Sequence, residues 1–240
     1  MFVVCTKMGK RDIIIAIDGH SSTGKSTFAR AISIRYGLTY VDTGALYRGV
    51  TLLSQREKLN DLKDNKNLTK LQELLEKAVF EFLPTGPNGY GQLYLNGENI
   101  EEEIRSIEVA QMVSKVASIP IIREFVDSLL KKYGAKRGVV MDGRDIGTVV
   151  FPNANLKIFM TAKPEIRAQR RFNEIIAKGG SANYQEILKN VQERDYLDEN
   201  RESAPLKRAP DAILLDNSYM TQKDQMRWIE KIVMERWGSK

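Results

Sequence analysis

The chain has 240 residues but only one cysteine, Cys5, and one histidine, His20. A single cysteine excludes a small secreted scaffold held together by disulfides. No apolar run approaches the ~20 residues that a membrane-spanning helix needs. Residues 1–5 are apolar and are followed by Thr6 and Lys7, whereas a signal peptide places its charge before a longer apolar stretch. We therefore expect a cytoplasmic protein with a short N-terminal extension over residues 1–11.

The overall composition is that of a globular protein. A hydrophobic share of 42% and a charged share of 28% give enough apolar surface to offset chain entropy, which argues against disorder. The net charge of +6 has two interpretations, a nucleic-acid-binding surface or a small-molecule site whose arginines hold phosphates. The positions of the arginines in the sequence must decide between them.

Short apolar runs alternate with helical patterns along the chain. Strand patterns occupy residues 12–17, 39–41, 138–141, 156–160 and 211–215. Helical patterns occupy residues 25–37, 45–59, 68–78, 101–132 with a break near Pro120, 163–178, 184–200 and 221–237. This alternation predicts an α/β fold with a parallel sheet covered by helices on both faces.

A different pattern interrupts the alternation. Residues 79–83 and 93–95 have strand character and flank a turn-dense segment, residues 84–91. Asn96-Gly97 then offers a further tight turn. We expect a small antiparallel sheet inserted into the α/β pattern.

The segment after the first strand is GHSSTGKS, which fits the phosphate-loop pattern G-x-x-x-x-G-K-[ST]. Its glycines let backbone N–H groups point at phosphate oxygens, and the helix that follows directs its positive end at the same anion. Lys25 is suited to the β and γ phosphates of a nucleotide, and the Ser26 hydroxyl to Mg²⁺. We assign nucleotide contacts to Gly19, His20, Ser21, Ser22, Thr23, Gly24, Lys25, Ser26 and Thr27.

Other interpretations of the loop 19–26 fit the sequence less well than a phosphate loop does. An ordinary glycine-rich turn before a helix has no need of a lysine followed by a hydroxyl residue. His20 is interpreted as a loop residue rather than a base, because phosphoryl transfer needs little proton chemistry at this position. GTPases add an N-K-x-D signature that the sequence lacks, and the acidic pair of ATPase motors is replaced by D-G-R-D at residues 142–145.

Residues 42–48, DTGALYR, follow a strand and open a helix. Their hydroxyl, backbone N–H groups and arginine suit either a second phosphate group or an ordinary helix cap. The residues alone leave both interpretations open.

Several stretches taken together resemble the bacterial cytidylate kinases, which belong to the nucleoside-monophosphate kinases. They are IDGHSSTGKST at residues 17–27, DTGALYR at 42–48, EEEIRSIEVAQMVSKVASIPIIRE at 101–124, MDGRDIGTVVFPNA at 141–154, ERDYLDENR at 193–201 and APL at 204–206. The resemblance covers nearly all of the chain except its ends. His20 stands where a proline is usual and Thr43 replaces a serine, and both departures are mild.

The resemblance implies an enzyme in three parts. These are a core over residues 12–42 and 133–240, a domain for the nucleoside monophosphate over residues 43–132, and a lid at about residues 163–182 within the core. The implied reaction, in pyrimidine nucleotide metabolism, transfers phosphate from ATP with Mg²⁺ to CMP or dCMP. We expect a monomer whose partners are small nucleotides, without nucleic acid or membrane.

The resemblance also implies which residues hold the acceptor. Thr43 and Arg48 would contact the nucleotide, Arg48 through its phosphate. The residues implied to face the pyrimidine are Ser114, Arg123 and Asp145. Phosphate would be bound by Arg144 and Arg201, and the sugar region by Arg194 and Asp198. Asp145 can accept from the 4-amino group of cytosine and would repel the carbonyl of uracil. The i, i+4, i+7 spacing predicts that Arg194, Asp198 and Arg201 share one helix face. The alternative to a binding role is that these residues form salt bridges within the helix on a solvated surface.

Arg167, Arg170 and Arg171 share a helix face at i, i+3 and i+4. A solvated basic helix is one interpretation. We favour lid arginines, since like charges on one face repel each other and an incoming triphosphate would relieve that repulsion. Lys25, Arg144, Arg167 and Arg171 are then the catalytic cations, and Arg170 is a further ATP contact.

Two other classes of function remain. A P-loop kinase for another nucleoside monophosphate or small metabolite would share the loop. A nucleic-acid binder would use the +6 charge, but the arginines fall mostly in the kinase-like motifs.

Overall fold

The computed structural model describes residues 12–59, 61–84 and 91–238. The predicted extension over residues 1–11 lies outside the described residues. The chain divides into two compact units, the first made of residues up to Tyr40 and from Tyr133 onward, the second of Val41–Lys132. Among the described residues, no helix combines the length and the apolar character needed to cross a bilayer.

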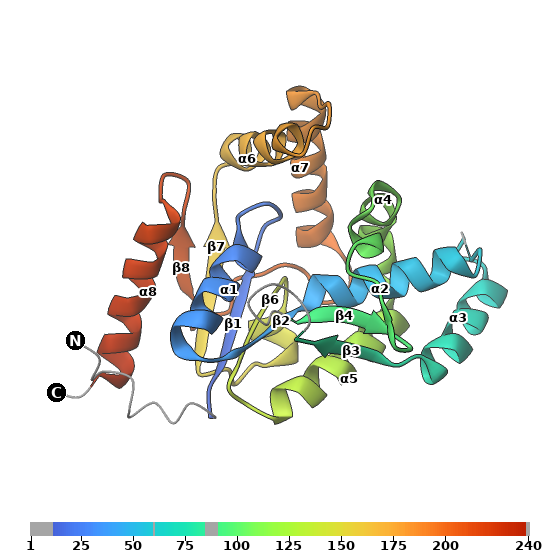
Figure 1. Ribbon diagram of the computed structural model, residues 1–240, viewed down its shortest axis with the longest axis horizontal. Helices are drawn as coiled ribbons and strands as arrows, with labels where there is room; N and C mark the ends of the chain where they lie inside the picture. Colours follow the sequence, from blue (N-terminus) through green and yellow to red (C-terminus); the bar gives the residue numbers. More distant parts are fainter. Residues whose placement is uncertain (1–11, 60, 85–90, 239–240) are drawn as a thin grey trace. The chain divides into compact units, whose positions relative to one another are not determined.

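The first unit is built on a parallel sheet (Figure 1). The strands are β1 (Ile14–Gly19), β2 (Thr39–Asp42), β6 (Val139–Gly143), β7 (Leu156–Thr161) and β8 (Ile213–Asp216), in the spatial order β2-β6-β1-β7-β8. The central strand β1 pairs in parallel with β6 and β7, and β7 pairs in parallel with β8. All of the predicted strands of this sheet are confirmed, and β2 is the strand at which the chain passes into the second unit.

Alternate residues of β1 face opposite sides of the sheet. Ile15 and Ile17 pack with α1 (Lys25–Tyr36) and α8 (Gln222–Trp237) in one apolar cluster. On the other side Phe159 packs against a cluster of small and aliphatic residues, Leu206, Ala209 and Ala212. Burial on both faces explains why the central strand β1 is a nearly continuous apolar run.

Two helices of the first unit, α6 (Pro164–Ala177) and α7 (Tyr184–Asn200), form a hairpin (Figure 1). Ala168, Ile187 and Val191 make a separate apolar cluster between them. Ahead of the hairpin, residues 146–150 form a π-helix, η3 (Ile146–Val150), between β6 and β7. The sequence patterns did not predict η3.

The second unit contains the predicted antiparallel sheet. Its strands are β3 (Phe80–Leu83), β4 (Gln92–Leu95) and β5 (Glu98–Asn99), and its helices are α2 (Thr43–Arg56), α3 (Asn65–Lys77), the 3₁₀ helix η2 (Glu103–Arg105), α4 (Ile107–Val116) and α5 (Pro120–Ala135), whose last turn belongs to the first unit. Asn96 and Gly97 both have positive φ (51° and 84°), as the predicted tight turn requires. The helix expected over residues 101–132 breaks at 117–119 as predicted, but it starts as a separate 3₁₀ turn.

Candidate active site

The loop between β1 and α1 depends on its two glycines. Gly19 has a φ of 147°, and a Cβ there would lie 1.9 Å from the carbonyl oxygen of Met160. Gly24 has a φ of 88° and immediately precedes the first residue of α1. These are backbone positions that side chains beyond glycine rarely occupy. The loop therefore brings its backbone amides round to the N-terminus of α1, as an anion site requires.

Lys25 lies inside this loop and is only 5% exposed. Its Nζ donates to the carbonyl of His20 at 2.6 Å. Burial, together with the nearby Arg144, holds the pKa of Lys25 well below its usual range, although the carboxylates of Asp142, Asp198 and Asp18 oppose the shift. A cation that is so poorly solvated gains from an incoming polyphosphate.

Ser26 is oriented by a buried carboxylate. Its Oγ donates to Asp142 Oδ2 at 2.9 Å, and the Tyr40 hydroxyl donates to Asp142 Oδ1 at 2.7 Å. Oxygen atoms on a fixed scaffold are the donor type that Mg²⁺ prefers, usually together with substrate phosphates. The Ser26 position thus fits the magnesium ion that the phosphate-loop motif implies. In the described part of the chain no cluster of three or more acidic, histidine or cysteine residues is placed to hold a metal alone.

The predicted lid arginines differ in what they contact. Arg167 is 2% exposed. It forms a bidentate ion pair with Asp195, in which Nη1 and Nη2 lie 2.8 and 2.5 Å from the two carboxylate oxygens. Its Nη1 also donates to the carbonyl of Ser21, in the phosphate loop, at 3.1 Å. Arg167 therefore ties α6 to α7 and to the loop, so the alternative interpretation, a solvated basic face, does not apply to this residue.

Arg170 reaches the loop through a buried asparagine. Its Nη1 donates to Asn217 Oδ1 at 3.1 Å, and its Nη2 to the Asn217 carbonyl at 2.7 Å. The Asn217 side chain donates in turn to the carbonyl of Thr23 at 2.8 Å. Asn217 is 1% exposed and joins the residues after β8 to both the loop and α6.

A cavity of about 320 Å³ opens beside the loop. Arg170 and Arg171 line it together with Thr27 of α1. Its other walls are the segment after β8 and the start of α8, with Asn217, Met220, Gln222, Gln225 and Met226. Apolar surface with a few amide groups, next to a phosphate loop, suits the base of a nucleotide.

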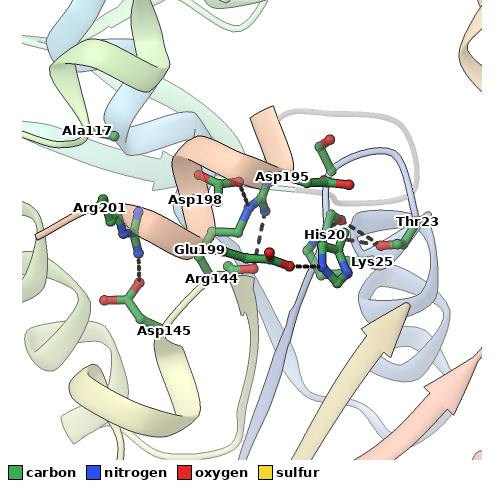
Figure 2. Close-up of polar contacts among 12 residues, drawn as sticks. His20, Thr23, Lys25, Ala117, Arg144, Asp145, Asp195, Asp198, Glu199 and Arg201 are labelled. Atoms are coloured by element: carbon green, nitrogen blue, oxygen red, sulfur yellow. Dashed lines mark hydrogen bonds and ion pairs between the residues drawn. The ribbon is translucent and has the colours of Figure 1, made fainter. Parts of the chain in front are cut away.

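Two ion pairs involve the segment between β6 and η3 (Figure 2). Arg144 Nε donates to Asp198 Oδ2 at 2.6 Å, and Arg201 Nη2 lies 3.3 Å from Asp145 Oδ1. Burial works against both charges of the first pair, but mutual attraction prevails, so the pKa of Asp198 lies below its usual value and that of Arg144 above. The structure thus brings Arg144, Asp145, Asp198 and Arg201 together.

The predicted common face of Arg194, Asp198 and Arg201 is only partly correct. Helix α7 ends at Asn200, and Arg201 follows it with extended backbone (φ −66°, ψ 143°). Its Nε donates to the carbonyl of Ala204 at 2.6 Å. Both arginines still act electrostatically on Asp198. Arg201 thus contacts Asp145 from the segment that follows α7 and does not lie on a face of the helix.

The side chain of His20 contacts residues outside the loop. Its Nε2 lies 2.8 Å from Glu199 Oε1 on α7, and its Nδ1 lies 3.3 Å from Thr161 Oγ1 (Figure 2 shows the pair with Glu199). Both ring nitrogens of His20 thus have protein partners, and its assignment as a loop residue rather than a base stays a prediction.

In the second unit, Asp42 organises the start of α2. Its Oδ1 accepts from the Ala45 amide at 2.9 Å, a helix cap, and its carboxylate accepts from Arg48 Nη2 at 3.2 Å and from Arg105 Nη2 at 3.4 Å. Thr43, the first residue of α2, is buried. Asp42 therefore caps the helix and also holds two guanidinium groups side by side on its carboxylate, while a phosphate contact of DTGALYR stays a prediction.

The other predicted residues of this unit lie on α4 and α5. Arg123 is 3% exposed, donates to the carbonyl of Ala117 at 3.2 Å and lies over the Tyr47 ring at 5.8 Å. Ser114 is a half-buried residue of α4. The stacking of Arg123 on Tyr47 links the predicted base-contacting arginine to the helix that carries Arg48.

Several functional-site residues escaped the sequence analysis. Arg105 and Asp195 lie within recognised stretches but give no signal of which charge they contact. Asn217 lies outside every recognised motif. It is distant from Thr23 in sequence, and only the three-dimensional fold places the two residues in contact. A signal that could have identified Asp18 is its place directly before Gly19, near the end of an apolar strand, where a buried charge is costly.

Comparison with known proteins gives one consistent family. The model of the family described as cytidylate kinase matches residues 15–235. A protein of Parabacteroides distasonis named cytidylate kinase is 47% identical over 91% of this chain and 95% of its own length. Proteins with the same name from Flavobacterium johnsoniae (48% identical, 93% and 96% covered) and Bacteroides thetaiotaomicron (46%, 92% and 96%) are similar to the same extent. A match over this much of the chain means that the protein belongs to the cytidylate kinase family.

Proposed function

We propose that the protein transfers the γ-phosphoryl group of ATP to CMP and dCMP, giving ADP with CDP or dCDP. The observation that carries the proposal is the loop 19–26, which combines a glycine-dependent turn, a buried lysine and an oriented serine hydroxyl. Membership of the cytidylate kinase family supports the choice of acceptor. We also propose that the enzyme acts in the cytoplasm, as a monomer and without nucleic acid.

The donor is held entirely by the first unit in this proposal. The loop amides and Lys25 take the phosphates, and Arg171 and Arg170 approach them from α6. The base enters the cavity lined by Met220, Gln222 and Met226. Arg167 holds the loop through Ser21 and stabilises α6 against α7, so its catalytic contribution is to place the loop and the lid.

The acceptor contacts are proposed separately for each unit. In the first unit, Arg144 and Arg201 take the acceptor phosphate, Asp145 reads the cytosine amino group, and Arg194 with Asp198 holds the sugar. In the second unit Arg48 takes phosphate and Thr43 the nucleotide, while Ser114 and Arg123 face the base. The side chain of Asp145, 3.3 Å from Arg201, can accept a hydrogen bond from the amino group of cytosine, which favours cytosine over uracil.

Positioning and charge neutralisation then account for catalysis. A phosphate monoester is largely doubly ionised at neutral pH, so the attacking oxygen needs no strong base. Lys25 and the arginines neutralise charge on the transferring group from fixed positions. Mg²⁺, when bound at Ser26, supplies further neutralisation of the phosphate oxygens. The α6–α7 hairpin excludes water that would otherwise hydrolyse ATP.

A coupled assay of ADP release tests the function directly. CMP and dCMP are expected to support turnover well above UMP and AMP at equal concentration, with no turnover when ATP is omitted. Preference for AMP, UMP or a non-nucleotide acceptor would contradict the proposal and favour a kinase for that compound.

Replacing Arg48 separates acceptor from donor binding. Arg48→Ala is expected to raise the KM for CMP about tenfold or more, because a charge-assisted contact to phosphate is lost, while the KM for ATP changes less than about twofold. Initial-rate kinetics with each substrate varied in turn measure both constants. Arg56→Ala is the matched control, since Arg56 ends the same helix but pairs with the carboxylates of Glu98 and Glu103. An unchanged KM for CMP would remove Arg48 from the acceptor site.

A further inference from the structure

Arg144 and Asp145 occupy a two-residue connection between β6, which ends at Gly143, and η3, which begins at Ile146. The backbone on both sides of this connection is held by one residue, Asp18 of β1. In the parallel register of β1 and β6, Asp18 lies opposite Gly143. The strand pairing thus fixes the chain just before Arg144.

The side chain of Asp18 fixes the chain just after Asp145. Its Oδ1 accepts from the Ile146 amide at 2.8 Å, and its Oδ2 accepts from the Gly147 amide at 2.7 Å. The first amides of a helix have no partner within the helix and need an outside acceptor. Each carboxylate oxygen of Asp18 satisfies one of them.

Keeping a carboxylate at this place costs stability. Asp18 is 5% exposed at the end of a strand whose other residues are apolar. Burial raises the pKa of Asp18 to about 6, and the nearby charge of Asp145 adds to the shift, although the two amide bonds and Lys25 act in the opposite direction. Groups with strongly shifted pKa values cluster at functional sites.

The space around the carboxylate is also restricted. A Cβ added at Gly147 would lie 3.2 Å from Asp18 Oδ2 and 3.1 Å from the Cδ of Lys157. The glycine therefore allows the helix backbone to approach the carboxylate closely.

We propose that Asp18 is a positioning residue for the acceptor nucleotide, which sets the backbone of Arg144 and Asp145 by holding the chain on both sides of them. This inference rests on the acceptor roles proposed above for these two residues. Although Asp18 directly precedes the phosphate loop, both of its carboxylate oxygens bind η3, so its effect is expected on CMP rather than on ATP.

The variant Asp18→Asn tests this role in the full chain. Its amide retains one acceptor but turns a donor toward the second helix amide. We expect the KM for CMP to rise about tenfold and the preference for CMP over UMP to fall by a similar factor, because small displacements of binding groups are costly. The KM for ATP is expected to change less than about twofold. Asp64→Asn is the control, since Asp64 caps exposed helix α3 through the Lys66 amide and asparagine caps equally well.

Amide hydrogen exchange measured by NMR gives a readout independent of the reaction. The amides of Ile146 and Gly147 should be protected in the wild-type chain and exchange at least about tenfold faster in Asp18→Asn, while those of the β1 core keep their protection. Should Asp18→Asn fold poorly, Gly147→Ala disturbs the same contact from the helix side and should also raise the KM for CMP more than that for ATP.

The inference is overturned if the two amides stay protected in Asp18→Asn, or if the KM for ATP rises as much as that for CMP. Failure of the proposed function looks different. A wild-type enzyme inactive on CMP would refute that function, and the exchange measurement would still show whether Asp18 holds this connection.

Discussion

Lys25→Ala is expected to lower the turnover number by about a thousandfold while the protein stays folded. The lysine is the cation inside the phosphate loop, and loss of one such preorganised group commonly costs two to three orders of magnitude. Its burial and depressed pKa mean that the charge is poorly solvated before ATP arrives. Saturating ATP should not restore the rate, since the missing interaction stabilises the transferring phosphoryl group.

The fold should tolerate this change. A lysine whose pKa is lowered in the folded state opposes folding when charged at neutral pH, so its removal takes away an unfavourable contribution. The His20 carbonyl retains the Thr23 hydroxyl as a donor at 3.0 Å. Thermal unfolding of Lys25→Ala is therefore expected at or above the wild-type temperature. Lys178→Ala, an exposed residue paired with Glu174 on α6, is the control and should keep full activity. Near-normal turnover by Lys25→Ala would refute the assigned role.

Asp145→Ala is expected to reduce the preference for CMP over UMP by about tenfold to a hundredfold. A contact that accepts from the cytosine amino group and repels the uracil carbonyl is worth roughly 1–3 kcal/mol of discrimination. The effect should come mainly from a lower kcat/KM for CMP. Competition between CMP and UMP in one reaction measures the ratio directly.

Asp145→Asn sharpens this experiment because it keeps the shape of the side chain. Its amide can donate to the uracil carbonyl, so the ratio should shift further toward UMP than in Asp145→Ala. Loss of the ion pair with Arg201 is common to both variants, and therefore their difference reports on the base. Equal, wild-type-like selectivity in both would show that the base is read by other residues.

Much of the fold could be predicted because its elements follow strong periodic patterns. Strands β1 and β6 are short runs rich in β-branched residues, and the helical pattern predicted over residues 25–37 ends at Gly37, which has the left-handed conformation. The π-helix η3 was missed because its shape depends on the two amide bonds to Asp18, more than a hundred residues away. The short strand β5 was missed because Glu98–Asn99 has no strand propensity and is held by pairing with Tyr94 and Leu95.

The site was predictable where a motif fixes local chemistry. The loop 19–26 carries its function in consecutive residues, so its lysine and serine were found directly. Asn217 and Asp195 carry no such signal, because an asparagine or an acid becomes a positioning group only when the chain path places it at Thr23 or Arg167. Arg201 shows the limit of spacing arguments, since one residue beyond the end of α7 the backbone turns and helical periodicity no longer applies.

The separate apolar cluster between α6 and α7 has a consequence for how nucleotides enter and leave. Because Ala168, Ile187 and Val191 pack within the hairpin and not into the sheet, we expect that movement of the hairpin would leave the main core covered. The contacts that oppose such movement are polar. They join Arg167 to Ser21, Arg170 to Asn217 and Glu199 to His20. When these bonds break, water can take the place of the lost partner, so we expect movement of the hairpin to cost less free energy than exposure of the apolar core would.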